Sequence, residues 1–103
     1  MADMTVANMI LTQLGGQRFL GITGSSNPTG SADSLTLKLS RNQAGASFLK
    51  ITLSPNDEYT MEFIRVRRTR IEIKKTIVYN VSGVYFDQLT EIFTRVTGLV
   101  THL

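Results

Sequence analysis

Lysine and arginine side chains are concentrated in one stretch of this sequence. The chain has 103 residues, with 11 Lys and Arg against 8 Asp and Glu, which gives a net charge of +3. The stretch between positions 65 and 75 holds Arg65, Arg67, Arg68, Arg70, Lys74 and Lys75. If it folds into a hairpin, these side chains concentrate positive potential at one end and on one face of a sheet. Such a patch attracts phosphate groups and acidic protein surfaces.

Three interpretations of this basic stretch stay open. It could bind nucleic acid, it could contact an acidic protein, or it could be solvated and protect an edge strand against aggregation. No aromatic residue falls between Arg65 and Lys75. The stacking surface that is typical of proteins that bind single-stranded nucleic acid is therefore missing from the stretch itself. Tyr79 is the nearest candidate for that role.

The residues that most enzymes use as nucleophile, base or metal ligand are scarce. The chain has no cysteine, which excludes a thiolate nucleophile and a cysteine-based metal site. The single histidine, His102, is next to the last position, where side chains are usually solvated. Asp57 and Glu58 are adjacent in an expected turn and lack the spacing of a calcium loop. The sequence therefore predicts a protein with no catalytic residue, no metal and no cofactor.

Two further features are candidates for chemistry. Glu62 and Glu72 could face each other across the last hairpin as an acid–base pair, but ion pairs with the basic residues around them are favoured. The glycine-rich segment 24–31 follows an expected strand, as a phosphate-binding loop does. It lacks the spacing and the lysine of a P-loop and leads into another strand, so we interpret it as a hairpin loop.

A first helix is predicted over residues 5–14, with Thr5 as its N-cap. Apolar residues at spacings of three and four fall on one face of it: Val6, Met9, Ile10 and Leu14. Gly15 and Gly16 would end this helix. Residues 18–23 are then predicted to form a strand, and residues 24–31 to form the loop that follows it.

Alternating apolar and polar residues predict three strands in the middle of the chain. Their inward-facing residues are Leu35, Leu37 and Leu39; Leu49, Ile51 and Leu53; and Tyr59, Met61 and Phe63. Ile64 and Val66 fall on the opposite parity from Phe63, which a β-bulge near Phe63 and Ile64 would explain. Residues 67–70 are the expected turn into a last strand. That strand would supply apolar residues to the core: Ile71, Ile73 and Ile77.

A second helix is predicted over residues 84–97, capped by Ser82 or Gly83 and ended by Gly98. Its apolar stripe contains Phe86, Leu89, Ile92, Phe93 and Val96. Glu91 and Arg95 are four residues apart in the order that favours an ion pair on a helix.

These elements predict an α+β protein in which residues 1–103 form a single domain. We expect an N-terminal helix, an antiparallel meander of about five strands and a C-terminal helix, in two layers with the helices on one sheet face. The other face would be polar and open. Residues 1–14 do not resemble a signal peptide, and no apolar run reaches the roughly 20 residues of a membrane span. These features favour a cytoplasmic protein that does not bind membranes.

Four parts of the sequence carry a resemblance to known proteins. They are residues 8–19 with Thr23 and Gly24, residues 50–53, residues 57–63 and residues 81–98. In the same order along the chain, they resemble a family of small uncharacterised proteins encoded by bacteriophages and other bacterial mobile elements. The basic stretch departs most from that pattern. The resemblance implies a phage or prophage gene and a bacterial cytoplasm, and it assigns no functional residue.

Three functions fit the sequence. The first is a non-enzymatic accessory binding protein of a mobile element, which acts on a host or phage protein such as a component of a defence system. The second is a nucleic-acid-binding protein that uses the basic hairpin 65–75. The third is a self-assembling structural protein, for example a homodimer. Its contact would use apolar residues left over on the second helix and the tail: Tyr85, Leu99, Val100 and Leu103.

Overall fold

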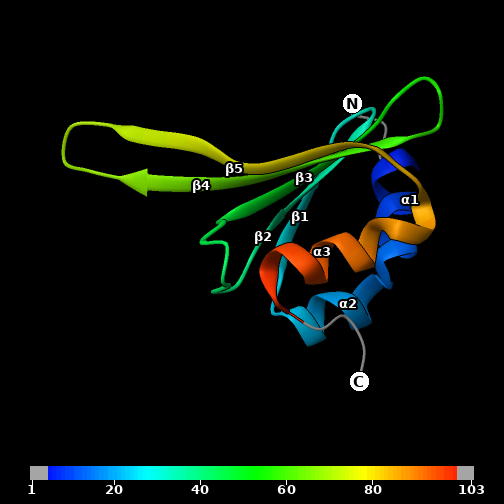
Figure 1. Ribbon diagram of the computed structural model, residues 1–103, viewed down its shortest axis with the longest axis horizontal. Helices are drawn as coiled ribbons and strands as arrows, with labels where there is room; N and C mark the ends of the chain where they lie inside the picture. The colour runs from blue at the N-terminus through cyan, green and yellow to red at the C-terminus, as the bar shows by residue number, and fades with distance from the viewer. Residues whose placement is uncertain (1–4, 100–103) are drawn as a thin grey trace.

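The computed structural model describes residues 5–99, which form helices on one side of a five-stranded antiparallel sheet (Figure 1). The elements are α1 (Thr5–Leu14), α2 (Gly16–Thr23), β1 (Ser26–Gly30), β2 (Ser34–Lys38), β3 (Phe48–Leu53), β4 (Tyr59–Arg68), β5 (Ile73–Val84), the 3-10 helix η1 (Phe86–Gln88) and α3 (Leu89–Thr97). The strand order is β1-β2-β3-β4-β5, so every strand pairs with its neighbour in the sequence. The predicted α+β fold with an antiparallel meander is confirmed.

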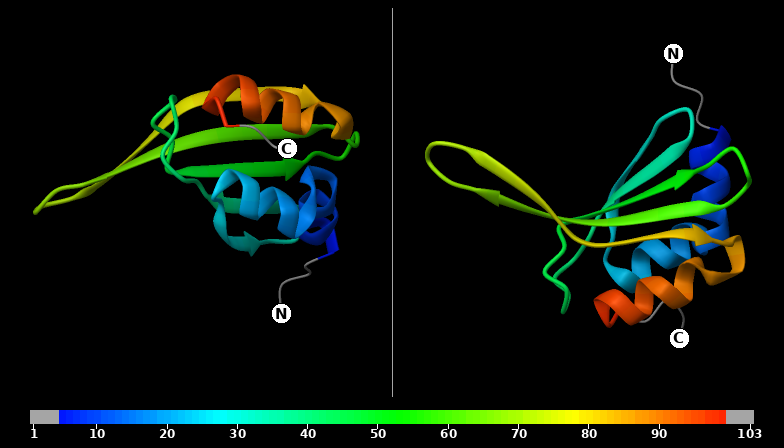
Figure 2. Two further views of the ribbon diagram at one scale, coloured as in Figure 1. Left: turned by 90° about the horizontal axis from the view of Figure 1, so that it is seen from below. Right: turned by 45° about the horizontal axis from the view of Figure 1, so that its top comes forward.

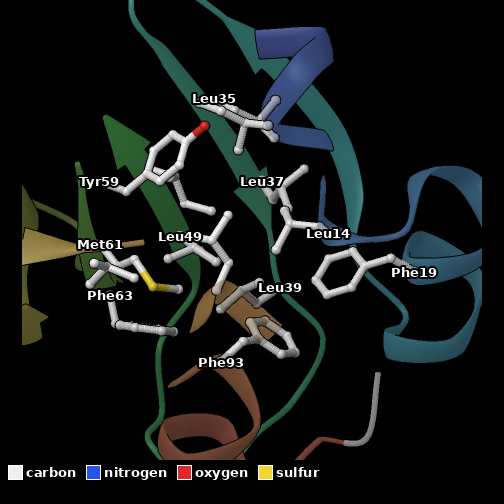
Figure 3. Close-up of a cluster of buried hydrophobic side chains, with 14 of the residues drawn as sticks. Leu14, Phe19, Leu35, Leu37, Leu39, Leu49, Tyr59, Met61, Phe63 and Phe93 are labelled. Atoms are coloured by element: carbon white, nitrogen blue, oxygen red, sulfur yellow. The ribbon is translucent and has the colours of Figure 1, made fainter. Parts of the chain in front are cut away.

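The core lies between the helices and one face of the sheet, which we call the inner face (Figure 2). Cross-strand rows of buried residues build that face, because side chains directly opposite each other in an antiparallel pair share a face. Leu35, Ile51 and Met61 form one row. Leu37, Leu49 and Phe63 form the next row (Figure 3). The helices of the described residues 5–99 all lie on the inner face, and we call the opposite face of the sheet the outer face.

The buried side of α1 differs from the predicted one. Ala7, Ile10 and Leu14 are buried, whereas Met9 is 39% exposed. The three buried positions are separated by three and four residues, which is the helical periodicity that the sequence predicts. The sequence pattern predicts Met9 on the packed face, whereas the structure has the small Ala7 there, and α1 packs against β2.

The prediction of a strand at residues 18–23 is wrong, because these residues belong to α2. Phe19 and Thr23 are four residues apart and both are buried, which is the spacing of a helix face. The predicted loop at 24–31 is also wrong in part. Residues Ser26–Gly30 form β1, an exposed edge strand that contains Pro28. Proline is tolerated on a sheet edge, where its missing N–H is not needed.

The β4–β5 hairpin extends beyond the helices, at the far left of Figure 1. Its turn lies at residues 69–72, two residues later than predicted. The three isoleucines assigned to the core are instead exposed: Ile71 at 94%, Ile73 at 62% and Ile77 at 51%. None of the helices within residues 5–99 covers this end of the sheet, so apolar residues there do not reach the core.

β5 continues to Val84, so the predicted caps Ser82 and Gly83 are strand residues. The helical segment begins only at Phe86, which is 62% exposed. Leu89 and Phe93 of the predicted stripe are buried, and the ion pair between Glu91 and Arg95 forms at 3.0 Å. α3 ends as predicted at Gly98, whose backbone has φ 75° and donates its N–H to the carbonyl of Thr94.

Candidate binding surface

The outer face carries apolar residues where the sequence predicted polar ones. Ile64 and Val66 keep the alternation of β4 and face outward, opposite Ile77 and Lys75 of β5. The register does shift between Phe63 and Ile64, as predicted. Phe63 pairs with residue 79 and Ile64 with residue 77, so the extra residue is on β5 and not on β4. The bulge therefore leaves the direction of Ile64 and Val66 unchanged.

A groove of about 550 Å³ lies on this outer face. Its apolar surface comes from Phe48 of β3, Ile64 and Val66 of β4, and Ile73 of β5. Phe48 is next to Ile64 in the register, which brings the ring and the aliphatic side chains together. Thr36 of β2 completes the far side. Strands that are separate in the sequence thus make one continuous apolar floor.

Three cations border the same groove. Lys50, Arg68 and Lys75 line it, and all three are exposed. Among residues 5–99, the one ion pair joins Arg95 to Glu91 on α3, far from this surface in the fold. Glu62 is the carboxylate opposite Lys50 in the register. The groove therefore combines an apolar floor with positive charge that no bridging carboxylate neutralises. We call this groove the outer-face groove, and eight residues line it: Thr36, Phe48, Lys50, Ile64, Val66, Arg68, Ile73 and Lys75.

The predicted basic patch is divided between the two faces of the hairpin. Arg67 stands opposite Lys74. Arg68 and Lys75 are each one residue further along their strands, so they point to the other side. Arg70 lies in the turn. The six cations share one end of the sheet, as expected, but they do not share one face.

Arg65 has a structural role within this set. Its Nε donates a hydrogen bond to the carbonyl of Gly45 at 3.2 Å, and its Nη2 donates to the carbonyl of Ala44 at 3.1 Å. Both acceptors belong to the loop between β2 and β3. Arg65 therefore fastens that loop to β4, and two of the five N–H donors of its guanidinium group are used in doing so.

The acid–base pair considered for Glu62 and Glu72 does not form. Glu62 lies opposite Asn80, and Glu72 lies in the hairpin turn, where its backbone bonds to Thr69. Asp57 and Glu58 lie in and beside the turn before β4, as predicted. His102 lies outside the described residues. Within residues 5–99 no group of three or more His, Cys, Asp or Glu side chains gathers in a metal-binding arrangement.

A smaller hollow of about 200 Å³ lies on the other side of the molecule, between α1, the start of β4 and η1. Met9 and Phe86 line it, and Tyr59 donates a hydrogen bond at 2.7 Å to Oε1 of Gln13. Burial raises the pKa of the Tyr59 hydroxyl above its ordinary value. The hydrogen bond to Gln13 acts in the opposite direction, and the Asp57 carboxylate adds to the rise.

Several groove residues were not among the predicted site residues. Phe48 and Lys50 come from β3, which the sequence predicted only as a core strand with Lys50 facing out. The available signal was parity: Phe48, Lys50, Ile64 and Val66 all have the parity that points away from the core. Four outward positions of which three are apolar indicate a second, solvent-facing apolar surface.

No protein-family model, no curated protein and no solved structure matches this chain. In the part of the chain described here, none of the helices has both the length and the hydrophobicity needed to cross a bilayer.

Proposed function

We propose that this protein is a non-enzymatic accessory binding protein of a phage or mobile element, which acts in the bacterial cytoplasm on a host or phage protein. A component of a defence system is one such target. The outer-face groove supports this proposal, because exposed apolar surface rimmed by polar groups marks interaction sites. Ile64 and Val66 occupy outward positions of a strand where polar residues would suit a solvated sheet face.

The resemblance to small proteins of phages and mobile elements supports the cellular context. It covers most of α1, part of α2, most of β3, the first half of β4, and the end of β5 with α3, and each of these elements contributes buried residues to the core. The hairpin beyond Ile64 departs from that pattern, so the partner of this chain would be specific to its own hairpin and groove.

A capture experiment tests the proposed function. The tagged protein is incubated with nuclease-treated bacterial lysate beside two variants, Val66→Glu in the groove and Ile71→Glu at the hairpin tip. Both replace a β-branched apolar residue with a carboxylate, but Ile71 is 94% exposed and lies outside the groove. A protein captured by the wild type and by Ile71→Glu, and lost with Val66→Glu, supports the proposal. Capture that does not distinguish the two variants contradicts it.

Nucleic-acid binding is the second candidate, and the projecting hairpin favours it. Arg67 and Lys74 are directly opposite each other, an arrangement of like charges that destabilises a strand pair unless a polyanion lies between them. Binding of this kind weakens steeply with salt. Charge reversal at Arg67 and Arg68 should abolish it, which an anisotropy titration with labelled DNA and RNA measures.

Self-assembly is the third candidate. Tyr85 is 55% exposed beside the exposed Phe86, whereas Leu99 packs against the core. Val100 and Leu103, the other residues named for a homodimer contact, lie outside the described residues. A mass measurement at high concentration that finds only monomer removes this candidate.

A further inference from the structure

The size of the outer-face groove indicates what kind of partner it accepts. It runs from Thr36 on β2 to Lys75 on β5, which is three strand spacings or about 14 Å. Along β4 it runs from Ile64 to Arg68, which is about 13 Å at roughly 3.3 Å per residue. The footprint of roughly 180 Å² is far below the roughly 800 Å² per partner of an interface between folded proteins. A short segment of chain fits it, since four or five extended residues cover about 14 Å.

The charge of the groove indicates the composition of that segment. Lys50, Arg68 and Lys75 stand around the floor without ion-pair partners among residues 5–99. Carboxylates on the segment would complement them and would also raise the rate of encounter. Glu62, opposite Lys50, is the one carboxylate that the register places beside the rim, and it leaves an excess of positive charge.

The side chains of the groove floor favour a protein segment over a nucleic acid as the ligand. Three of its four apolar side chains, Ile64, Val66 and Ile73, are β-branched aliphatic groups, and Phe48 supplies the single ring. Single-stranded nucleic acid is held by stacking of successive bases on aromatic rings, which aliphatic groups do not provide. They do provide contact area for apolar side chains of a peptide.

We propose that the outer-face groove binds a short acidic segment of a partner protein through one or two apolar side chains placed on the floor and carboxylates placed on the rim. This inference rests on the proposed function and names the partner chemistry of the same site. The segment crosses β3, β4 and β5, and the hairpin cations Arg68 and Lys75 contact it while Arg67 and Lys74 face away.

The division of the hairpin charges gives a matched control. One triple variant, Lys50→Gln with Arg68→Gln and Lys75→Gln, removes the groove cations. The other, Arg67→Gln with Arg70→Gln and Lys74→Gln, removes the same charge from exposed positions outside the groove. All six side chains are exposed and make no ion pair among residues 5–99, so both proteins are expected to fold, which circular dichroism and thermal melting check.

The probes are labelled peptides of about ten residues, followed by fluorescence anisotropy. One carries Asp and Glu around a central Leu-Phe pair, the second has Ser in place of Leu-Phe, and the third has Asn and Gln in place of the acids. Labelled oligo-dT is the fourth. We expect the first peptide to bind best. Loss of the groove cations should weaken binding of the first peptide about tenfold, since three exposed ion pairs, each weak by itself, would be lost together. The control triple should change it by less than about threefold.

A substitution on the groove floor measures the contribution of the apolar contact to peptide binding independently of the cations. Val66→Thr keeps the branched shape of the side chain and replaces one methyl group with a hydroxyl. This substitution should weaken binding of the Leu-Phe peptide several-fold and leave binding of the Ser peptide unchanged. Equal losses for both triple variants would show a general charge effect and overturn the proposal. Tighter binding of oligo-dT that depends on the groove cations would also overturn it, in favour of nucleic acid. If no peptide binds while lysate capture still depends on Val66, the proposed function stands and this inference fails.

Discussion

Phe19 of α2 and Phe93 of α3 meet edge to face, with ring centroids 5.0 Å apart and the ring planes at 63°. Both rings are fully buried. Each is followed four residues later by a buried threonine whose hydroxyl donates a 2.7 Å hydrogen bond to the phenylalanine carbonyl: Thr23 to Phe19 and Thr97 to Phe93. α2 and α3 are therefore built in the same way and contact each other through the same residue type.

The contact between Phe19 and Phe93 should contribute measurably beyond the area that it buries. In a double-mutant cycle with Phe19→Leu and Phe93→Leu, we expect a coupling energy of about 0.5–1.5 kcal/mol from urea denaturation. The control cycle pairs Phe93→Leu with Phe48→Leu. Phe48 lies on the outer face, so that coupling should be near zero. Equal couplings in both cycles would show that the ring contact is not special.

Much of the sheet was predictable, but α2 was not, for a physical reason. In β2, β3 and β4 an apolar residue at every second position indicates which face is buried, and local pattern alone decides the strand. α2 has only eight residues, and most of its stability comes from packing, so its own pattern is weak. The repeated spacing Phe19–Thr23–Gly24 and Phe93–Thr97–Gly98 was the signal that could have identified both helix ends.

Part of the outer-face groove was predictable as a cluster of charge, but the groove itself was not. The sequence shows that the cations lie between positions 65 and 75. Their faces depend on the register between β4 and β5 and on how far the hairpin extends past the helices, which nonlocal pairing decides. Phe48 and Lys50 join the groove only because β3 lies beside β4. A groove lined by residues of four strands cannot be found from one stretch of sequence.

Arg65 should contribute to stability where its neighbours do not. Arg65→Gln removes the two hydrogen bonds to the carbonyls of Ala44 and Gly45, and we expect the free energy of unfolding to fall by about 1–2 kcal/mol. Hydrogen exchange should accelerate in the loop between β2 and β3. Arg67→Gln is the matched control and should change stability by less than about 0.5 kcal/mol. If the two variants are equally stable, the fastening role of Arg65 is wrong.

Two glycine-to-alanine substitutions should change the stability of the protein in opposite directions. Gly98 ends α3 at φ 75°, and an added Cβ would lie 2.8 Å from Oε1 of Gln43, so Gly98→Ala should destabilise by about 1–2 kcal/mol. Gly21 lies within α2 with open space around it, so Gly21→Ala should stabilise by about 0.5–1 kcal/mol. Thermal unfolding measures both. A destabilising Gly21→Ala would argue against a helix at residues 16–23.

Tyr59 should make stability depend on alkaline pH. Its hydroxyl is buried, and burial raises its pKa, so the folded protein holds the proton more tightly than the unfolded chain, where the pKa is about 10. The contribution of the neutral hydroxyl is therefore fully present below about pH 10 and is lost as the pH rises through the raised pKa. Above the unfolded pKa the free energy of unfolding should fall with pH.

Tyr59→Phe isolates this effect, because it removes the titrating group and keeps the ring in the core. It should cost about 0.5–1.5 kcal/mol at neutral pH, since the hydrogen bond to Gln13 is lost. Its unfolding free energy should then fall less steeply above pH 10 than that of the wild type, so the difference between them narrows. Tyr85→Phe is the control, because Tyr85 is 55% exposed. Parallel curves for the wild type and Tyr59→Phe up to high pH would contradict a raised pKa, since the buried hydroxyl would then contribute nothing to the alkaline slope.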